Sequence, residues 1–190
     1  MPETGRHFVI AGAGISGLTL ALALAQRGAR VTVLERSPTV QEVGAGLQIS
    51  PNARHVLDQL GLHEAVAAVS FEPKALDTYP HGATSPLLSM ELGDVLRQRF
   101  GAPYAVMHRG DLAEVLYGAC AAQYNIRFEF GVRSWEVRDT ADGVETMIKA
   151  SDGVDTSINA HAFIGADGVH SQTRRKVLGG PEALFDNRIA

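Results

Sequence analysis

The sequence is poor in cysteine, in long hydrophobic runs and in positive charge. Cys120 is the only cysteine, so no disulfide can form within the chain and a reducing, cytoplasmic setting is expected. The longest apolar stretch, residues 18–25, is far too short to cross a bilayer, and the N-terminus shows no signal-peptide pattern. The formal net charge of −4 offers no basic surface for nucleic acid. These absences predict a cytoplasmic protein that binds neither membrane nor nucleic acid.

Metal ligands and an obvious nucleophile are lacking as well. The seven histidines are scattered, and none pairs with another histidine, cysteine or acid at a familiar ligand spacing, so no metal site is predicted. Cys120 falls in a helical stretch and is expected to be a core residue rather than a catalytic thiol. Because 45% of the residues are hydrophobic and 20% are charged, the composition is ordinary for a globular protein with a buried core.

The most informative stretch is residues 8–17, Phe-Val-Ile-Ala-Gly-Ala-Gly-Ile-Ser-Gly. Its apolar run predicts a buried parallel strand, followed by a tight turn and a helix over 15–27. Gly12 is expected to permit the turn, Gly14 to let the backbone approach a pyrophosphate, and Gly17 to let helix and strand pack closely. The unpaired N–H groups and the positive dipole end of the helix would then face the phosphates.

A second apolar run, residues 31–34, is followed by Glu35. This acid lies about 18 residues after Gly17, near the spacing at which a carboxylate accepts hydrogen bonds from the adenosine ribose. It would repel a 2′-phosphate, so the pattern favours FAD or NAD over NADP. The alternative is a close-packed βαβ unit without a ligand.

The rest of the chain predicts an α/β fold: a Rossmann-like parallel sheet, an antiparallel β-meander crossover and the beginning of a β-rich second domain. Strands are expected at 126–130 and 161–164 in the parallel sheet, at 103–107, in a hairpin at 74–79 and 86–92, and in the meander at 132–138, 143–150 and 154–160. The Asp-Gly pairs at 142–143 and 152–153, in the connections 141–143 and 151–153, predict the turns of the meander. Helices are expected at 51–60, capped by Ser50 and ended by Gly61, and from Asp111 through 123. Their apolar spacing predicts one face of the first helix with Val56, Leu57 and Leu60, and one buried face of the second with Leu112, Val115, Leu116 and Ala119. The predicted division is 1–72 and 103–183 for nucleotide binding, 73–102 for the start of a substrate domain, and 184–190 for the start of a further strand.

Three further stretches are ambiguous on their own. The glycine-rich piece 44–52 fits backbone lying against a flat ring system, or a simple loop. Arg109 either faces the pyrophosphate or is a solvated surface arginine. Residues 165–171 predict a turn in which Asp167 supplies one acceptor. Trp135 is expected to pack in the meander.

Taken together, five motifs in this order resemble the single-component flavoprotein aromatic hydroxylases, and most of all their salicylate hydroxylase and 3-hydroxybenzoate 6-hydroxylase branch. The motifs are Gly-Ala-Gly-Ile-Ser-Gly (12–17), Glu-Arg (35–36), Gly-Ala-Gly-Leu-Gln-Ile-Ser-Pro-Asn (44–52), His-Arg-Gly-Asp-Leu (108–112) and Gly-Ala-Asp-Gly-Val-His-Ser (165–171). The resemblance runs from the first strand almost to the last residue.

The resemblance implies FAD as the bound cofactor and NADH or NADPH as a transient reductant. It implies that backbone around Gly46 and Leu47 borders the flavin, that Arg109 reaches the ribityl and pyrophosphate, and that Val132 lies beside the adenine. The cofactor-binding residues expected in full are Gly12, Gly14, Ile15, Ser16, Gly17, Glu35, Arg36, Gly46, Leu47, Gln48, Arg109, Val132, Asp167 and Gly168.

The sequence also departs from that family. It lacks the downstream Gly-Asp-Ala-x-His motif and most of the sheet that would cover a substrate, so it is interpreted as the N-terminal half of a longer or split enzyme. The implied partners are a small aromatic substrate, O2 and the missing C-terminal half, with a homodimer as a further arrangement. No catalytic residue is predicted, because His108, His161 and His170 are expected to be structural or on the surface. A flavin-binding module without turnover and a NAD-dependent dehydrogenase are the rival functions.

Overall fold

The computed structural model describes residues 5–40, 46–150 and 155–184. Contacts divide the chain into two compact units. Unit 1 consists of Met1–Gln41 and Leu116–Ala190, and unit 2 is Glu42–Val115. The four-segment domain division expected from the sequence stays a prediction, and the strand expected from residue 184 onward lies almost wholly outside the described residues.

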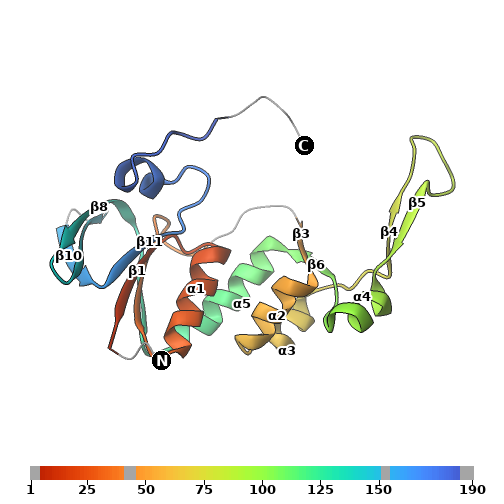
Figure 1. The fold of residues 1–190 in the computed structure, drawn as a ribbon, viewed down its shortest axis with the longest axis horizontal. Helices are drawn as coiled ribbons and strands as arrows, with labels where there is room; N and C mark the ends of the chain where they lie inside the picture. Colours follow the sequence, from red (N-terminus) through yellow and green to blue (C-terminus); the bar gives the residue numbers. More distant parts are fainter. Residues whose placement is uncertain (1–4, 41–45, 151–154, 185–190) are drawn as a thin grey trace. The chain divides into compact units, whose positions relative to one another are not determined.

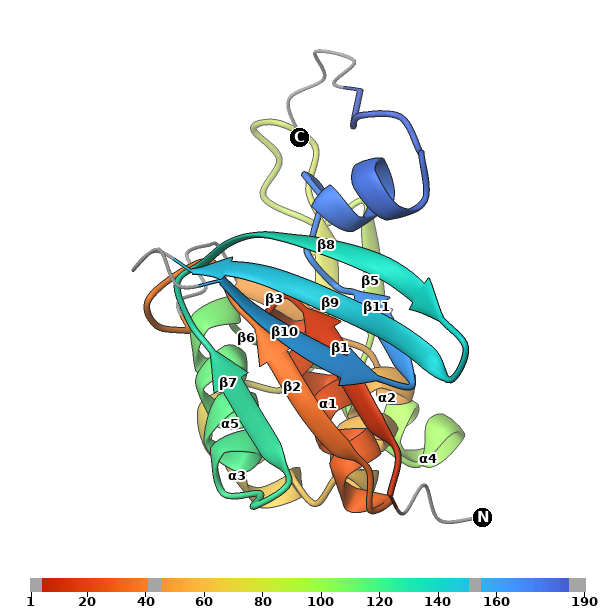
Figure 2. The same ribbon diagram turned by 90° about the vertical axis from the view of Figure 1, so that its left-hand side faces the viewer.

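Unit 1 is built on a parallel sheet. Its strands are β1 (His7–Ala11), β2 (Arg30–Leu34), β7 (Ile126–Glu129) and β11 (Ala162–Gly165), in the order β11-β1-β2-β7. Figure 1 labels β1 and β11, and Figure 2 labels all four strands. All three pairings are parallel. The strands predicted at 8–11, 31–34, 126–130 and 161–164 are therefore confirmed. Because the strands run the same way, their carboxyl ends meet at one edge of the sheet, where ligands bind in folds of this kind.

An antiparallel meander lies across one face of this sheet, and helix α1 (Ile15–Gln26) covers the other (Figure 2). The meander consists of β8 (Val132–Thr140), β9 (Gly143–Ala150) and β10 (Asp155–Ala160), in the order β10-β9-β8. The predicted meander is confirmed; the turn expected at 151–153 lies outside the described residues. The core between the two sheets contains Val9, Ala11, Leu34, Val132, Trp135, Ile148 and Ala160.

Helix α5 (Arg109–Ala121) begins two residues earlier than predicted, so Arg109 is its first residue. Leu112 and Leu116 are buried as expected, but Val115 and Ala119 are only half-buried. Ala113 and Cys120 are buried instead. The thiol of Cys120 donates a hydrogen bond of 3.3 Å to the Leu18 carbonyl, and burial raises its pKa to about 12. Cys120 is thus a core residue, and a thiol with that pKa is a poor nucleophile near neutral pH.

Unit 2 contains a feature that the sequence did not predict. Residues 46–49 form strand β3 (Gly46–Ile49), which pairs antiparallel with β6 (Ala105–His108). The loop interpretation of 44–52 is wrong for these four residues, because the pairing with β6 outweighs the weak strand propensity of a glycine-rich segment. Residues 44 and 45 lie outside the described residues.

Three helices complete the packed part of unit 2: α2 (Pro51–Gln59), α3 (His63–Val69) and α4 (Gly93–Phe100). α2 was predicted, while α3 and α4 were not. The expected buried face of α2 is only partly correct, because Leu57 and Leu60 are buried but Val56 is 46% exposed. Ser50 stands at the N-cap position, yet its hydroxyl donates to the Asn52 side chain instead of capping a backbone N–H.

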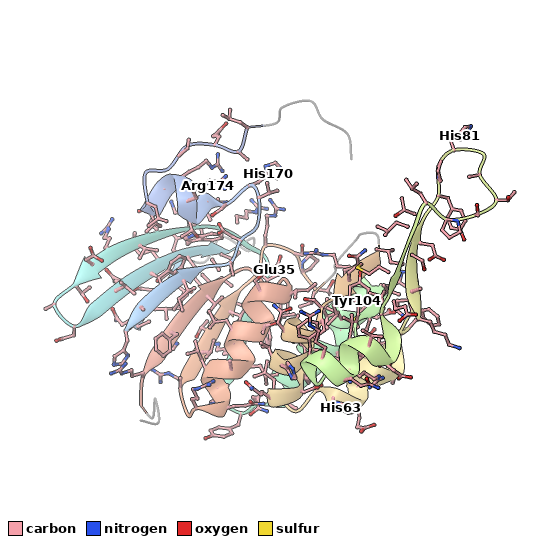
Figure 3. All side chains as sticks on the ribbon, turned by 45° about the vertical axis from the view of Figure 1, so that its right-hand side comes forward. Glu35, His63, His81, Tyr104, His170 and Arg174 are labelled. Carbon is pink, nitrogen blue, oxygen red and sulfur yellow. The ribbon has the colours of Figure 1, made fainter. Side chains whose placement is uncertain are left out.

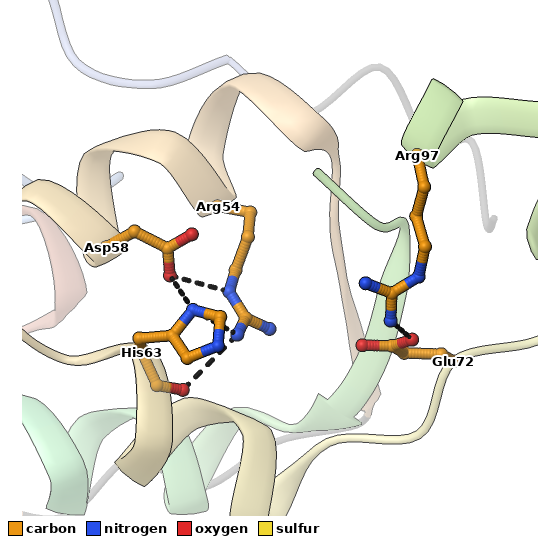
Figure 4. A network of polar contacts seen from close by, with 5 residues as sticks. All are labelled: Arg54, Asp58, His63, Glu72 and Arg97. Carbon is orange, nitrogen blue, oxygen red and sulfur yellow. Dashed lines mark hydrogen bonds and ion pairs between the residues drawn. The ribbon is translucent and has the colours of Figure 1, made fainter. Parts of the chain in front are cut away.

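Arg54 is the most buried charged side chain on α2, at 1% exposure. Its Nε donates to Asp58 Oδ1 at 2.8 Å, and its Nη2 donates to the carbonyl of His63 at 3.2 Å (Figure 4). Burial opposes ionisation of Asp58, but hydrogen bonds from Arg54 and His63 outweigh it and lower the pKa of Asp58. An ion pair between Arg97 and Glu72 lies nearby (Figure 4). The contacts of Arg54 tie α2 to α3.

The predicted hairpin is confirmed as β4 (Ala75–Thr78) and β5 (Leu88–Glu91), paired antiparallel. All residues of both strands are exposed. At the other end of the chain, the turn at 165–171 leads only into a short π-helix, η1 (Thr173–Val177). In the described ranges, no helix has the length and apolarity needed to cross a membrane, and no cluster of three or more potential metal ligands occurs.

Candidate functional site

The tight turn after β1 lies at the carboxyl edge of the parallel sheet in unit 1. Gly12 has φ +103°, which L residues rarely adopt, and its N–H donates to the Leu34 carbonyl at 2.7 Å. A Cβ at Gly12 would lie 2.4 Å from the Ala166 carbonyl oxygen. The turn therefore needs glycine for its backbone angle and for the close approach of the segment after β11.

Gly17 brings the first helix against that same turn. A Cβ there would lie 2.0 Å from the Gly12 carbonyl oxygen, a distance that real atoms never reach. The close packing of helix and strand expected at Gly17 is confirmed.

The N-terminus of α1 is open to an anion. Gly14 is the N-cap residue, and within the described part of the chain no side chain caps it and no acid occupies the first turn. The first helical bond runs from Leu18 N to the Gly14 carbonyl at 2.9 Å, so the N–H groups that precede it have no partner within the helix. Unpaired N–H groups and the positive end of the helix dipole suit a phosphate.

Glu35 places a carboxylate beside this helix end (Figure 3). Its Oε2 accepts a hydrogen bond from Ala13 N at 2.9 Å, and its Oε1 accepts one from Ser37 N at 2.8 Å. Each oxygen of a carboxylate has a second acceptor site, so Glu35 can hold the glycine turn and still accept hydroxyl donors. The backbone carbonyl of Glu35 accepts from Val132 N at 3.0 Å, which brings Val132 to the same edge. The side chain of Arg36 is exposed.

Asp167 and Gly168 follow β11, at the same carboxyl edge of the sheet. The N–H of Ala166 donates to the Ala11 carbonyl at 2.8 Å. The side chain of Asp167 accepts from Ser171 Oγ at 2.6 Å and from Thr173 N at 3.0 Å. Burial opposes the charged form, but these hydrogen bonds outweigh it and lower the pKa of Asp167. The acceptor expected at Asp167 thus orders the turn that follows it.

The other predicted cofactor residues belong to unit 2. In the pairing of β3 with β6, Gly46 is opposite His108, Leu47 opposite Met107 and Gln48 opposite Val106. Arg109 follows His108 directly. The predicted residues thus form two groups. Unit 1 holds Gly12, Gly14, Ile15, Ser16, Gly17, Glu35, Arg36, Val132, Asp167 and Gly168, and unit 2 holds Gly46, Leu47, Gln48 and Arg109.

Unit 2 also contains an apolar groove that sequence reasoning missed. Its volume is about 500 Å³, and its lining consists of Gly46, Ala68, Val69, Ser70, Phe71, Val106, Met107 and His108. Phe71 reaches the groove because its backbone bridges to Val106. No local pattern marks a pairing between residues so far apart in the sequence. The sequence feature that pointed to this region was His108, which directly precedes the predicted cofactor-binding residue Arg109.

The residues of unit 1 fit FAD. The site combines a turn that requires glycine, an open helix N-terminus and an adjacent carboxylate. This arrangement matches the diphosphate and ribose of a dinucleotide. The parallel sheet with its meander crossover therefore defines a Rossmann-like FAD-binding domain. The chain belongs to the family described as "FAD binding domain", which matches residues 7–182.

Relatives of the chain include hydroxylases and monooxygenases that act on hydroxybenzoates. The chain is 37% identical over 173 residues to 3-hydroxybenzoate 6-hydroxylase 1 of Aquipseudomonas alcaligenes, covering 91% of this chain and 43% of that protein. It is 38% identical over 178 residues to 3-amino-4-hydroxybenzoate 2-monooxygenase of Streptomyces cremeus, covering 94% and 43%. The chain thus spans less than half the length of these relatives.

A solved structure has the same fold. The p-nitrophenol 4-monooxygenase PnpA from Pseudomonas putida DLL-E4 is similar with a TM-score of 0.82 and 25% identity, over 92% of this chain and 44% of that one. The tetrameric form of 2-methyl-3-hydroxypyridine-5-carboxylic acid oxygenase has a TM-score of 0.73 and 27% identity, over 92% and 42%. The expected family and fold class are confirmed.

Proposed function

We propose that this chain is the FAD-binding part of a flavoprotein monooxygenase that hydroxylates a phenolic or benzoate-type aromatic with NAD(P)H and O2. The observation that carries the proposal is the combination of the glycine turn, the open N-terminus of α1 and Glu35 at one sheet edge. The two hydroxybenzoate monooxygenases that share more than a third of their aligned residues with it support the substrate class.

Each group of residues has a distinct task in this proposal. The N–H groups at the start of α1 bind the diphosphate, and Glu35 binds the ribose hydroxyls. Arg36 and Val132 border the adenosine, while Asp167 and Gly168 shape the turn beside it. Gly46, Leu47, Gln48 and Arg109 border the flavin and its ribityl chain. When bound, FAD supplies the redox and oxygen chemistry; the protein orients the ring and excludes water.

The exposed hairpin of β4 and β5 supports the proposal that a further part of the protein covers it. On one face of the hairpin, Leu76 is opposite Met90, and Thr78 is opposite Leu88. Leu76, Leu88 and Met90 are 47%, 62% and 49% exposed. A two-stranded hairpin is only marginally stable alone, so this apolar face fits the start of a substrate domain completed by a C-terminal half or by a partner chain. A homodimer belongs to the same proposal.

The test of the activity uses a complete protein that contains this chain, loaded with FAD. Salicylate and 3-hydroxybenzoate should each be added to the enzyme with NADH or NADPH, and substrate-stimulated oxidation of the nicotinamide and a hydroxylated product should be measured. We expect stimulation and product with at least one of them. Absence of both with every hydroxybenzoate tried would reject the proposal.

The test of the cofactor site is the affinity for FAD of Glu35→Gln. The amide keeps the size of the side chain but loses its charge and presents a donor to one of two backbone N–H groups. We expect FAD to bind about 10- to 100-fold more weakly, because a hydrogen bond to a charged group contributes about 1.5–3 kcal/mol. Glu114→Gln, an exposed change on α5, is the matched control and should bind as the parent does.

The alternative function is a flavin-binding module without turnover. The chain accounts for only 43% of the length of its relatives, which favours this alternative if the native protein has a mass near 20.2 kDa. About twice that mass favours the enzyme. A colourless protein without flavin absorbance would instead favour a NAD-dependent dehydrogenase.

A further inference from the structure

Three consecutive residues of β6, Val106, Met107 and His108, line the groove of unit 2. Ala105 and Met107 are buried, Val106 is half-buried and His108 is exposed. Because successive side chains of a strand point to opposite faces, Val106 and His108 share one face of β6, and Met107, on the other face, also belongs to the lining. Gly46, opposite His108 on β3, adds no side chain and leaves the space open.

Phe71 forms a wall of this groove. Its N–H donates to the Val106 carbonyl at 2.8 Å, and its carbonyl accepts from Val106 N at 2.8 Å. This double bridge holds the backbone of Phe71 in place, yet its side chain is 67% exposed. An exposed aromatic ring on a backbone held in this way can contact the face or edge of a second ring.

The lining of the groove contains few polar side chains. Among its described lining residues, His108 is the only one with a titratable side chain, and Ser70 contributes the only hydroxyl. The volume of about 500 Å³ is within the range of small-molecule sites, which combine apolar walls with few polar groups. An aromatic ring with one anionic substituent matches this arrangement, because an imidazole N–H can donate to a carboxylate.

We propose that this groove binds the aromatic ring of the substrate, with Phe71 and Val106 against the ring and His108 donating to its carboxylate. The inference rests on the proposed function and assigns residues of this chain to the substrate site. Gly46 belongs both to the groove lining and to the residues expected to border the flavin, so a ring bound here would lie beside the strand that is proposed to border the cofactor.

The experiment measures the dissociation constant of 3-hydroxybenzoate by calorimetry on the complete, FAD-loaded protein without NAD(P)H. We expect His108→Gln and Phe71→Ala each to raise it about 10-fold. Phenol lacks the carboxylate, so its binding should weaken in Phe71→Ala and stay unchanged in His108→Gln. The controls are Glu114→Gln and Tyr124→Ala, both exposed positions outside the groove, which should bind as the parent does.

The possible outcomes separate the two proposals. Flavin absorbance per mole of protein shows whether each variant is folded and loaded. If the parent binds and hydroxylates 3-hydroxybenzoate while both groove variants bind it as tightly as the controls do, the groove assignment is wrong and the proposed function stands. If the parent binds no hydroxybenzoate, both are wrong. If His108→Gln weakens the binding of phenol and of 3-hydroxybenzoate equally, the proposed role of His108 is wrong.

Discussion

The two units of this chain differ in where their apolar side chains lie. In unit 1, four of the five residues of β1 and of β2 are buried, and the meander adds a further core around Trp135. In unit 2, the hairpin of β4 and β5 is exposed over its whole length. The strands of unit 1 therefore pack into a buried core, whereas the hairpin of unit 2 exposes an apolar face to which another part of the protein can bind.

The same contrast holds for the two groups of predicted cofactor residues. In unit 1, hydrogen bonds and close approaches hold Gly12, Gly17 and Glu35 in one arrangement. In unit 2, the one described neighbour within 4 Å of the missing Cβ of Gly46 is the Met107 carbonyl, at 3.5 Å, an ordinary contact. Substitutions at these positions of unit 1 should therefore lower both the stability of the fold and the affinity for FAD. Substitutions at the surfaces of unit 2 should change only the affinity for the molecule that binds there.

The largest difference is expected between two leucines. Leu116→Ala removes a side chain with 0% exposure from α5, and Leu88→Ala shortens one that is 62% exposed on β5. Chemical denaturation of the 190-residue chain should show a loss of about 2–5 kcal/mol for Leu116→Ala and at most about 0.5 kcal/mol for Leu88→Ala. Similar losses would mean that the hairpin is already covered, for instance by a second copy, and would remove the contrast.

The next effect concerns two helical glycines. Gly17→Ala should lower the free energy of unfolding by about 1–3 kcal/mol, because overpacking costs that much and its Cβ would collide with the backbone of Gly12. Gly118→Ala is the matched control on α5, since no described neighbour lies within 4 Å of its Cβ. It should be neutral or stabilise the helix by up to about 1 kcal/mol. Denaturation curves that rank the two variants the other way would contradict the close packing.

A smaller effect depends on pH and on His7. This side chain is 7% exposed, with Nδ1 near the Asn159 carbonyl at 3.0 Å and Nε2 near Thr32 Oγ1 at 2.9 Å. Burial lowers the pKa of His7, although the Asn159 carbonyl offsets part of that shift. Below about pH 6.5 the unfolded chain gains a proton that the folded chain does not. The free energy of unfolding should therefore fall as the pH drops from 7 to 5.

His7→Gln isolates this contribution, because glutamine does not titrate in the range. The fall in the free energy of unfolding should be smaller in the variant, by on the order of 1 kcal/mol. Thermal unfolding of both proteins at several pH values measures the difference. Equal pH dependence in the two proteins would mean that His7 does not titrate differently on folding.

The smallest effect is expected at Ser50. Replacing an N-cap serine by alanine costs about 1 kcal/mol when its side chain bonds a backbone N–H of the helix. Here the hydroxyl donates to Asn52 instead. Ser50→Ala should therefore cost less than about 0.5 kcal/mol, measured by denaturation, and a full capping loss would show that Ser50 does bond the helix backbone.

Local patterns were sufficient for much of unit 1. The apolar runs predicted β1 and β2, the glycines predicted the turn between β1 and α1, and the Asp-Gly pair at 142–143 predicted the hairpin between β8 and β9. Each of these depends on residues close together in the sequence. The family resemblance, which the comparisons confirm, also rests on short motifs of this kind.

The sequence by itself determined the Rossmann-like FAD-binding unit, because its turns and strand periods are local properties of the chain. Only the tertiary structure decided that residues 46–49 form a strand with β6, that Phe71 bridges to Val106 and that Ala166 closes on Gly12. These contacts join segments far apart in the sequence. Their strength comes from the partner strand or carbonyl, not from the propensity of either segment, so no local pattern could predict them.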